Sequence, residues 1–235
     1  MRVGVVALVL AASIAMTAAE AASQTLSPPL AEYRKKADGV LTLGNDGDAA
    51  LAAILEVREF SVDGDGNLAY GPAPSDVKVE LGSNSFVIPP HQTHYVFYRA
   101  SCAHAPCWFA IINTLTRATA VTGGLRINIV LPHLVYVYQK AKFKKSDVRV
   151  EVSAGEREGV YRLKFENFSD KLERVETVQA RGFPDGQTYG GFPLFPRQTR
   201  SVSFQTGAPS KRASFRIQFG GGLHFDVPLS EEPAK

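Results

Sequence analysis

Several residue types are scarce in this sequence of 235 residues, and each scarcity excludes a class of protein. Two cysteines exclude a small scaffold held together by many disulfides. The 26 lysines and arginines nearly balance the 23 aspartates and glutamates, which excludes a general nucleic-acid binder. Hydrophobic residues form 45% of the chain, too many for a disordered protein. A globular protein of one or two domains remains.

Sequence patterns typical of enzyme active sites are also missing. The chain has no Gly-x-Ser-x-Gly turn, no glycine-rich phosphate loop between a strand and a helix, and no His-Glu-x-x-His. We therefore expect a protein that is not an enzyme and that needs no cofactor.

One long hydrophobic run is present, at the N-terminus. Arg2 precedes an unbroken run of apolar or small residues from Val3 to Met16, which is shorter than the roughly 20 residues of a membrane span. The segment Ala19-Glu20-Ala21 fits the pattern that signal peptidase reads. We predict that residues 1–21 are a signal peptide and that the mature protein is exported to a compartment that permits disulfides.

The rest of the sequence is typical of an all-β protein. Short runs of Val, Ile, Leu, Phe and Tyr alternate with polar residues, and Gly, Pro, Asp and Asn mark the turns. No segment has a 3.6-residue apolar rhythm of useful length. The expected strands are 39–44, 51–60, 76–80, 84–88, 93–100, 108–116, 125–138, 147–153, 159–166, 173–182, 198–205, 212–219 and 222–228. Six or seven strands in each half predict two immunoglobulin-like β-sandwich domains in an L-shaped arrangement.

A lysine-rich segment at 139–147 marks the expected boundary between the domains, which we place at 22–141 and 142–235. Four lysines fall within six positions: Lys140, Lys142, Lys144 and Lys145. One interpretation is a solvated linker. The other is a basic floor to a cleft between the domains, which requires the preceding strand to continue so that alternate lysines share one face.

The expected strand at 125–138 is unusually long and apolar. Its odd-numbered residues, from Leu125 to Val137, form an evident core face, whereas the even-numbered residues begin polar and become apolar. Pro132 cannot donate a ladder hydrogen bond, which places it at a sheet edge or a bulge. A long apolar edge needs a cover. Either a partner strand added to the edge or the second domain would supply it.

Cys102 and Cys107 enclose four residues, and in an oxidising compartment we predict a disulfide between them. The alternative is a zinc or copper site shared with nearby histidines. It is weakened because Cys-x4-Cys is not a common zinc spacing and because two of the histidines would face opposite sides of a strand. We therefore predict no metal site. The histidines are His91, His94 and His104.

Six segments occur in an order that resembles the PapD-like periplasmic chaperones of chaperone–usher pilus assembly, in a divergent or archaic form. They are Thr25–Pro28, Val40–Asp48, residues 54–60 with the DGDGNL turn that follows, Phe86–Arg99, CWFAII at 107–112 and LPHLVYV at 131–137. Pro90 stands where the signature of the family usually has glycine. The resemblance covers most of the first domain after the signal peptide.

The resemblance implies a periplasmic protein that acts by donor strand complementation. Such a chaperone lends alternate side chains of its long strand to a pilin-like subunit whose immunoglobulin-like fold is incomplete, and an outer-membrane usher then receives the subunit. The residues we favour for this role are Asn128, Val130 and Leu134. A register error of one residue reverses the faces, so the opposite parity stays open: Ile127, Ile129 and Leu131. The free chaperone would also be able to self-associate through this edge.

One departure from the family bears on function. The resemblance implies a basic pair that holds the terminal carboxylate of the subunit, but by spacing the two positions fall near Pro29 and Val135, and neither is basic. The candidate substitutes are Arg99, which lies at a motif position, and Arg34, Arg126 and Lys140. If subunit capture is lost, the alternative is a secreted immunoglobulin-like module with a fixed partner. A periplasmic metal carrier is the third hypothesis.

Overall fold

The computed structural model describes residues 24–34, 36–118, 127–184, 186–210 and 212–229, so the expected signal peptide and Arg126 lie outside the described residues. Apart from two 3-10 turns, η1 (Lys145–Asp147) and η2 (Gly220–Gly222), the regular structure is all strand. This confirms the all-β prediction. No helix in the described ranges is both long and apolar enough to cross a membrane.

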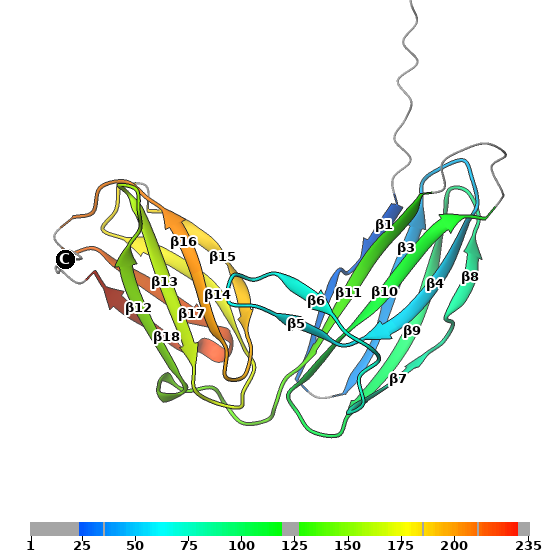
Figure 1. Ribbon diagram of the computed structural model, residues 1–235, viewed down its shortest axis with the longest axis horizontal. Helices are drawn as coiled ribbons and strands as arrows, with labels where there is room; N and C mark the ends of the chain where they lie inside the picture. The colour runs from blue at the N-terminus through cyan, green and yellow to red at the C-terminus, as the bar shows by residue number, and fades with distance from the viewer. Residues whose placement is uncertain (1–23, 35, 119–126, 185, 211, 230–235) are drawn as a thin grey trace, which may run out of the picture.

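The N-terminal domain is a sandwich of two sheets (Figure 1). One sheet has the order β1-β3-β9-β7 and the other has the order β2-β11-β10-β4-β8, while β5 and β6 form a separate hairpin. The inner faces of both sheets bury a core that includes Leu41, Val96, Phe109 and Ile111. The strands are β1 (Gln24–Ser27), β2 (Leu30–Tyr33), β3 (Ala37–Asn45), β4 (Leu51–Arg58), β5 (Phe60–Val62), β6 (Leu68–Tyr70), β7 (Val77–Leu81), β8 (Ser85–Ile88), β9 (Gln92–Cys102), β10 (Cys107–Arg117) and β11 (Asn128–Val137).

The C-terminal domain is a second sandwich, with sheets ordered β12-β13-β16 and β15-β14-β17-β18. Its core is rich in phenylalanine, including Phe165, Phe215 and Phe219. The two domains diverge from the linker, and the β5–β6 hairpin crosses the space between them (Figure 1). The strands are β12 (Val148–Ala154), β13 (Val160–Asn167), β14 (Glu173–Arg181), β15 (Thr188–Leu194), β16 (Thr199–Gln205), β17 (Ser214–Phe219) and β18 (His224–Pro228).

Several strands, including β2, β6 and β15, were not among the expected ones. β15 was not expected, because its glycines and proline mask the strand pattern; the backbone at Gly191 runs so close to the carbonyl oxygen of Val175 that a side chain has no room. Of the two interpretations of the linker lysines, the shared strand face is excluded, because β11 ends at Val137 and residues 138–144 form no strand. The four lysines are exposed, as a solvated linker requires.

Each domain contains a buried asparagine at the end of a strand, and the two make matching contacts. In the N-terminal domain, Asn45 Nδ2 donates to the carbonyl of Ala49 at 2.9 Å and Asn45 Oδ1 accepts from the Gly47 N–H at 3.2 Å. In the C-terminal domain, Asn167 Nδ2 donates to the carbonyl of Lys171 at 2.7 Å, and Asn167 Oδ1 accepts from the Ser169 N–H at 3.0 Å. The side-chain amide of each asparagine thus holds the tight turn that follows its strand through hydrogen bonds to the backbone.

A second pair of matching positions lies beside these asparagines. Among the described residues, His91 and Arg197 are the non-glycine residues with positive φ, at 55° and 57°. Each lies in a Pro-x-Gln-Thr segment that leads into a strand, and each contacts an aspartate three residues after the asparagine of its domain. His91 contacts Asp48 at 3.0 Å, and Arg197 contacts Asp170 at 2.9 Å.

Candidate functional site: an open strand edge

The outer edge of β11 is only partly covered. One edge pairs with β10 along the whole strand, from Asn128 to Val137. The other edge pairs in parallel with β2, but only from Leu134 to Val137. In the described part of the chain no strand lies on that edge between Asn128 and His133, because β1 joins β3 in the opposite sheet. About half of β11 is therefore an open edge.

The backbone direction along this edge follows from two hydrogen bonds to the β2 segment. The Leu134 N–H donates to the Pro29 carbonyl at 2.9 Å, and the Tyr138 N–H donates to the Tyr33 carbonyl at 2.7 Å. Because backbone groups alternate in direction along a strand, even-numbered residues point their N–H and C=O toward the open edge. Asn128 and Val130 therefore offer unpaired backbone groups there. Pro132 lies on the open side too, so its missing N–H costs no bond with β10.

The side chains of β11 also alternate. Val135 and Val137 are buried in the core of the N-terminal domain, and Ile129 and Leu131 pack against it. On the opposite face Asn128 is exposed and Val130 is 54% exposed. Leu134 faces the same way but packs against a buried cluster between the domains. The assignment of Ile127 to the core face was wrong: it precedes β11 and its side chain is 63% exposed.

Apolar side chains continue from Val130 across the outer face of the same sheet. Val130 pairs with Thr114 of β10, and Thr114 pairs with Ile54 of β4. Ile54 and Val87 are both more than half exposed. The open edge therefore adjoins an apolar strip on the sheet face.

A buried histidine lies on the core side of the same strand. His133 Nδ1 lies 2.7 Å from the Pro28 carbonyl oxygen, which accepts only, so Nδ1 carries the proton. His133 Nε2 therefore accepts from the Tyr98 hydroxyl at 3.0 Å, and the Tyr98 oxygen lies 2.8 Å from the hydroxyl of Tyr33. Burial lowers the pKa of His133 and raises that of Tyr98. This network holds the Pro28 segment, where the chain passes from β1 in one sheet to β2 in the other.

At the C-terminal end of β11, charged side chains of the two domains form an ionic network that the sequence did not predict. Glu32 accepts a hydrogen bond from the Tyr138 hydroxyl at 2.6 Å and lies 3.4 Å from Arg174 Nη1. Arg34 Nη2 lies 3.5 Å from Glu173 Oε1. Burial raises the pKa of the Glu173 carboxyl. The sequence analysis named Arg34 as a candidate anchor for a partner's carboxylate, but it did not indicate Glu32, because β2 itself was not expected from alternation.

The predicted basic anchors are not gathered around β11. Arg99 lies on the outer face of β9, in the opposite sheet, where its Nε contacts Asp38 at 2.9 Å. Arg34 pairs with Glu173 and lies over the ring of Tyr138. Lys140 is exposed in the linker. Arg126 lies outside the described residues.

Cys102 and Cys107 form a disulfide, as predicted. His94 stacks on Phe86, and His91 contacts Asp48. Among the described residues, no three His, Cys, Asp or Glu side chains gather in a way that would hold a metal ion. The metal-carrier hypothesis therefore lacks a ligand set in this part of the chain.

Comparisons by sequence and by structure give different results. No family model matches the chain, and no curated protein matches it. Solved structures do match, and they define a class of fold: the two immunoglobulin-like domains of the fimbrial chaperones.

Three such structures show the extent of the likeness, and each covers 88% of this chain. The class 5 fimbriae chaperone CfaA is 11% identical with a TM-score of 0.51 over 100% of its own chain. The YadV chaperone is 10% identical with a TM-score of 0.52 over 99% of its chain. The Salmonella enterica SafB chaperone structure, solved with the SafA pilin, is 14% identical with a TM-score of 0.50 over 97% of its chain. At these identities the fold is what is shared.

Proposed function

We propose that this protein is a periplasmic, non-enzymatic chaperone that captures an incompletely folded pilin-like subunit on the open edge of β11 and delivers it to an outer-membrane usher. The observation that carries the proposal is the unpaired edge from Asn128 to His133 with an exposed valine at its middle. The fold supports it, because the SafB chaperone of that fold is described in complex with a pilin.

The edge supplies two kinds of interaction to an added strand. The outward backbone groups of Asn128 and Val130, and the Pro132 carbonyl, would continue the sheet into the partner. The side chains on the exposed face would give selectivity, and burying them is worth about 25 cal/mol per Å² of apolar surface. We keep Asn128, Val130 and Leu134 as the proposed donor set. Val130 is its most accessible apolar member, whereas Leu134 pairs with β2 and packs against the cluster between the domains.

The substitution Val130→Asp tests this proposal. A charge placed in the apolar groove of a partner would be buried without a counter-ion, so we expect capture of a co-expressed subunit to fall at least tenfold. The matched control is Val40→Asp, because Val40 is 39% exposed on the outer face of β3 in the opposite sheet. Recovery of the complex from periplasmic extracts is measured by intact mass. Equal recovery with both variants would remove the β11 assignment.

A fixed-partner binding module is the second candidate function. It is favoured because Arg34 and Arg174, at the C-terminal end of β11, are already paired with Glu173 and Glu32 and are not free to hold the carboxylate of a subunit. The two functions predict different results when a second subunit is added to the complex. A chaperone complex should release its subunit when a second subunit offers its own strand, whereas a fixed module should keep its partner through the same chase.

A further inference from the structure

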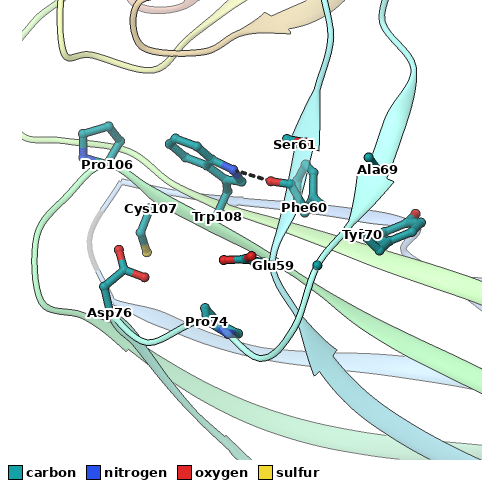
Figure 2. Close-up of a pocket in the computed structure, with 11 residues that line it drawn as sticks. Glu59, Phe60, Ser61, Ala69, Tyr70, Pro74, Asp76, Pro106, Cys107 and Trp108 are labelled. Carbon is teal, nitrogen blue, oxygen red and sulfur yellow. Dashed lines mark hydrogen bonds between the residues drawn. The ribbon is translucent and has the colours of Figure 1, made fainter.

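A pocket of about 440 Å³ opens at the base of the β5–β6 hairpin (Figure 2). None of its lining residues belongs to β11. This volume is in the range of small-ligand sites. Its walls come from the hairpin, from the segment that leads into β7, and from the start of β10 beside the disulfide. Nothing in the proposed capture of a subunit uses this pocket.

The walls of the pocket are aromatic. Trp108, Tyr70 and Phe60 line it. The Trp108 Nε1–H is already used, because it donates to the Phe60 carbonyl at 2.9 Å (Figure 2). The indole N–H is therefore not available to a ligand, and Trp108 can contribute only ring surface to the pocket lining. Ring faces of tryptophan and tyrosine attract cations.

Two carboxylates, Glu59 and Asp76, also line the pocket, and none of its eleven lining residues is basic. Figure 2 shows the Glu59 carboxylate between Trp108 and Pro74, with Asp76 beside Cys107. The nearest basic residues along the chain face other carboxylates: Arg58 pairs with Glu56 at 3.1 Å, and Lys78 pairs with Glu80 at 3.0 Å. These two neighbouring basic residues therefore do not pair with the carboxylates that line the pocket.

We propose that this pocket binds an organic cation, a guanidinium or ammonium group on an aliphatic stem. The carboxylates supply charge-assisted hydrogen bonds, and the aromatic walls supply cation–π contact and cover the stem. An arginine or lysine side chain of a partner protein and a free polyamine share this chemistry.

The single tryptophan of the chain makes the test direct, because Trp108 lines the pocket and is the only source of tryptophan emission. The probes are N-acetyl-arginine amide, its neutral analogue N-acetyl-citrulline amide, and spermidine, titrated at constant ionic strength. We expect a saturable change in emission with the arginine probe and at least fivefold weaker binding of the citrulline analogue. Tighter binding of spermidine than of the arginine probe identifies a polyamine site, and the reverse identifies a side-chain site.

The variants Glu59→Gln and Asp76→Asn should each weaken the arginine probe at least fivefold. Glu151→Gln removes the same charge from an exposed position on β12 and should change binding less than twofold. Equal binding of the arginine and citrulline probes, or equal loss in Glu59→Gln and Glu151→Gln, overturns the proposal. Val130→Asp should leave probe binding unchanged, so this result is separate from that of subunit capture.

Discussion

At the scale of single residues, the buried imidazole of His133 links the pH of the solution to the stability of the fold. Its Nε2 accepts a hydrogen bond, so the neutral ring is the form that the native network uses. Burial lowers its pKa in the folded protein, whereas the unfolded chain keeps an ordinary value near 6.5. Between these two values the unfolded state binds more protons than the folded state.

The sign of the pH dependence follows from this difference. The stabilisation from neutral His133 is fully present above pH 6.5 and is lost as the pH falls through the lower, folded-state pKa. We expect the free energy of unfolding to decrease over that window with a slope of at most about 1.4 kcal/mol per pH unit. Urea unfolding of the wild type and of His133→Gln at several pH values between 5 and 8 measures it.

The variant His133→Gln should have lower stability at pH 8 and a flatter pH profile. The control His91→Gln removes an exposed histidine, which contacts Asp48, and should keep the profile of the wild type. Parallel profiles for the wild type and His133→Gln would show that this histidine does not produce the dependence.

Residue roles were partly readable in the sequence. The alternation of β11 gave the buried parity, because a strand with one buried face must repeat every second residue. Ile127 was misplaced because the pattern does not show where the sheet ends. Glu32 and Arg174 were missed because ion pairs between domains depend on the angle between the domains, which no local pattern encodes.

At the scale of elements, Pro132 protects the open edge of β11. Its backbone nitrogen faces the open side, where any other residue would add an N–H donor. The sequence placed Pro132 at an edge or a bulge, and the structure puts it on the open edge. The sequence did not show how short the covering strand β2 is, because its four residues follow two prolines and carry no alternation.

The substitution Pro132→Ala should therefore increase self-association. It completes the row of donors at Asn128, Val130 and position 132 without disturbing the ladder to β10. We expect the dimer fraction at a fixed concentration to rise severalfold in sedimentation velocity. Adding Val130→Asp to Pro132→Ala should reverse the increase. An unchanged monomer would indicate that Pro132 does not limit edge pairing.

At the scale of the whole molecule, the domains are joined by a small core of their own. Phe195 of the C-terminal domain packs against Phe60, Trp108 and Tyr136, with ring centroids 4.9 to 6.1 Å apart. The hairpin adds polar contacts: Gln198 Nε2 donates to the Val62 carbonyl at 2.8 Å, and the Ser201 N–H donates to the Gly64 carbonyl at 2.9 Å. These contacts fix the position of the second domain beside β11.

Phe195→Ala should loosen this junction. Removing a buried phenylalanine costs about 3–5 kcal/mol, and here the loss falls on the contact between the domains. We expect calorimetry to resolve two unfolding transitions where the wild type shows greater overlap, and small-angle scattering to show a larger radius of gyration. Phe168→Ala, at a side chain 45% exposed, is the control. One shared transition in Phe195→Ala would mean that the domains couple elsewhere.

The two-sandwich architecture was predictable because strand periodicity and turn residues are local signals. The hairpin that crosses to the second domain was not. The segment from Asp63 to Asn67 reads only as a turn, and the partners of that turn are more than 130 positions away in the chain.

The matched turns show that both domains close the connection between their two sheets with the same kinds of side chain. Asn45, Asp48 and the Pro-His-Gln-Thr segment of one half reappear in the other half as Asn167, Asp170 and Pro-Arg-Gln-Thr, with the same contacts and the same left-handed residue. The same small set of residues therefore closes a turn in the domain that carries the open edge of β11 and in the domain beside it.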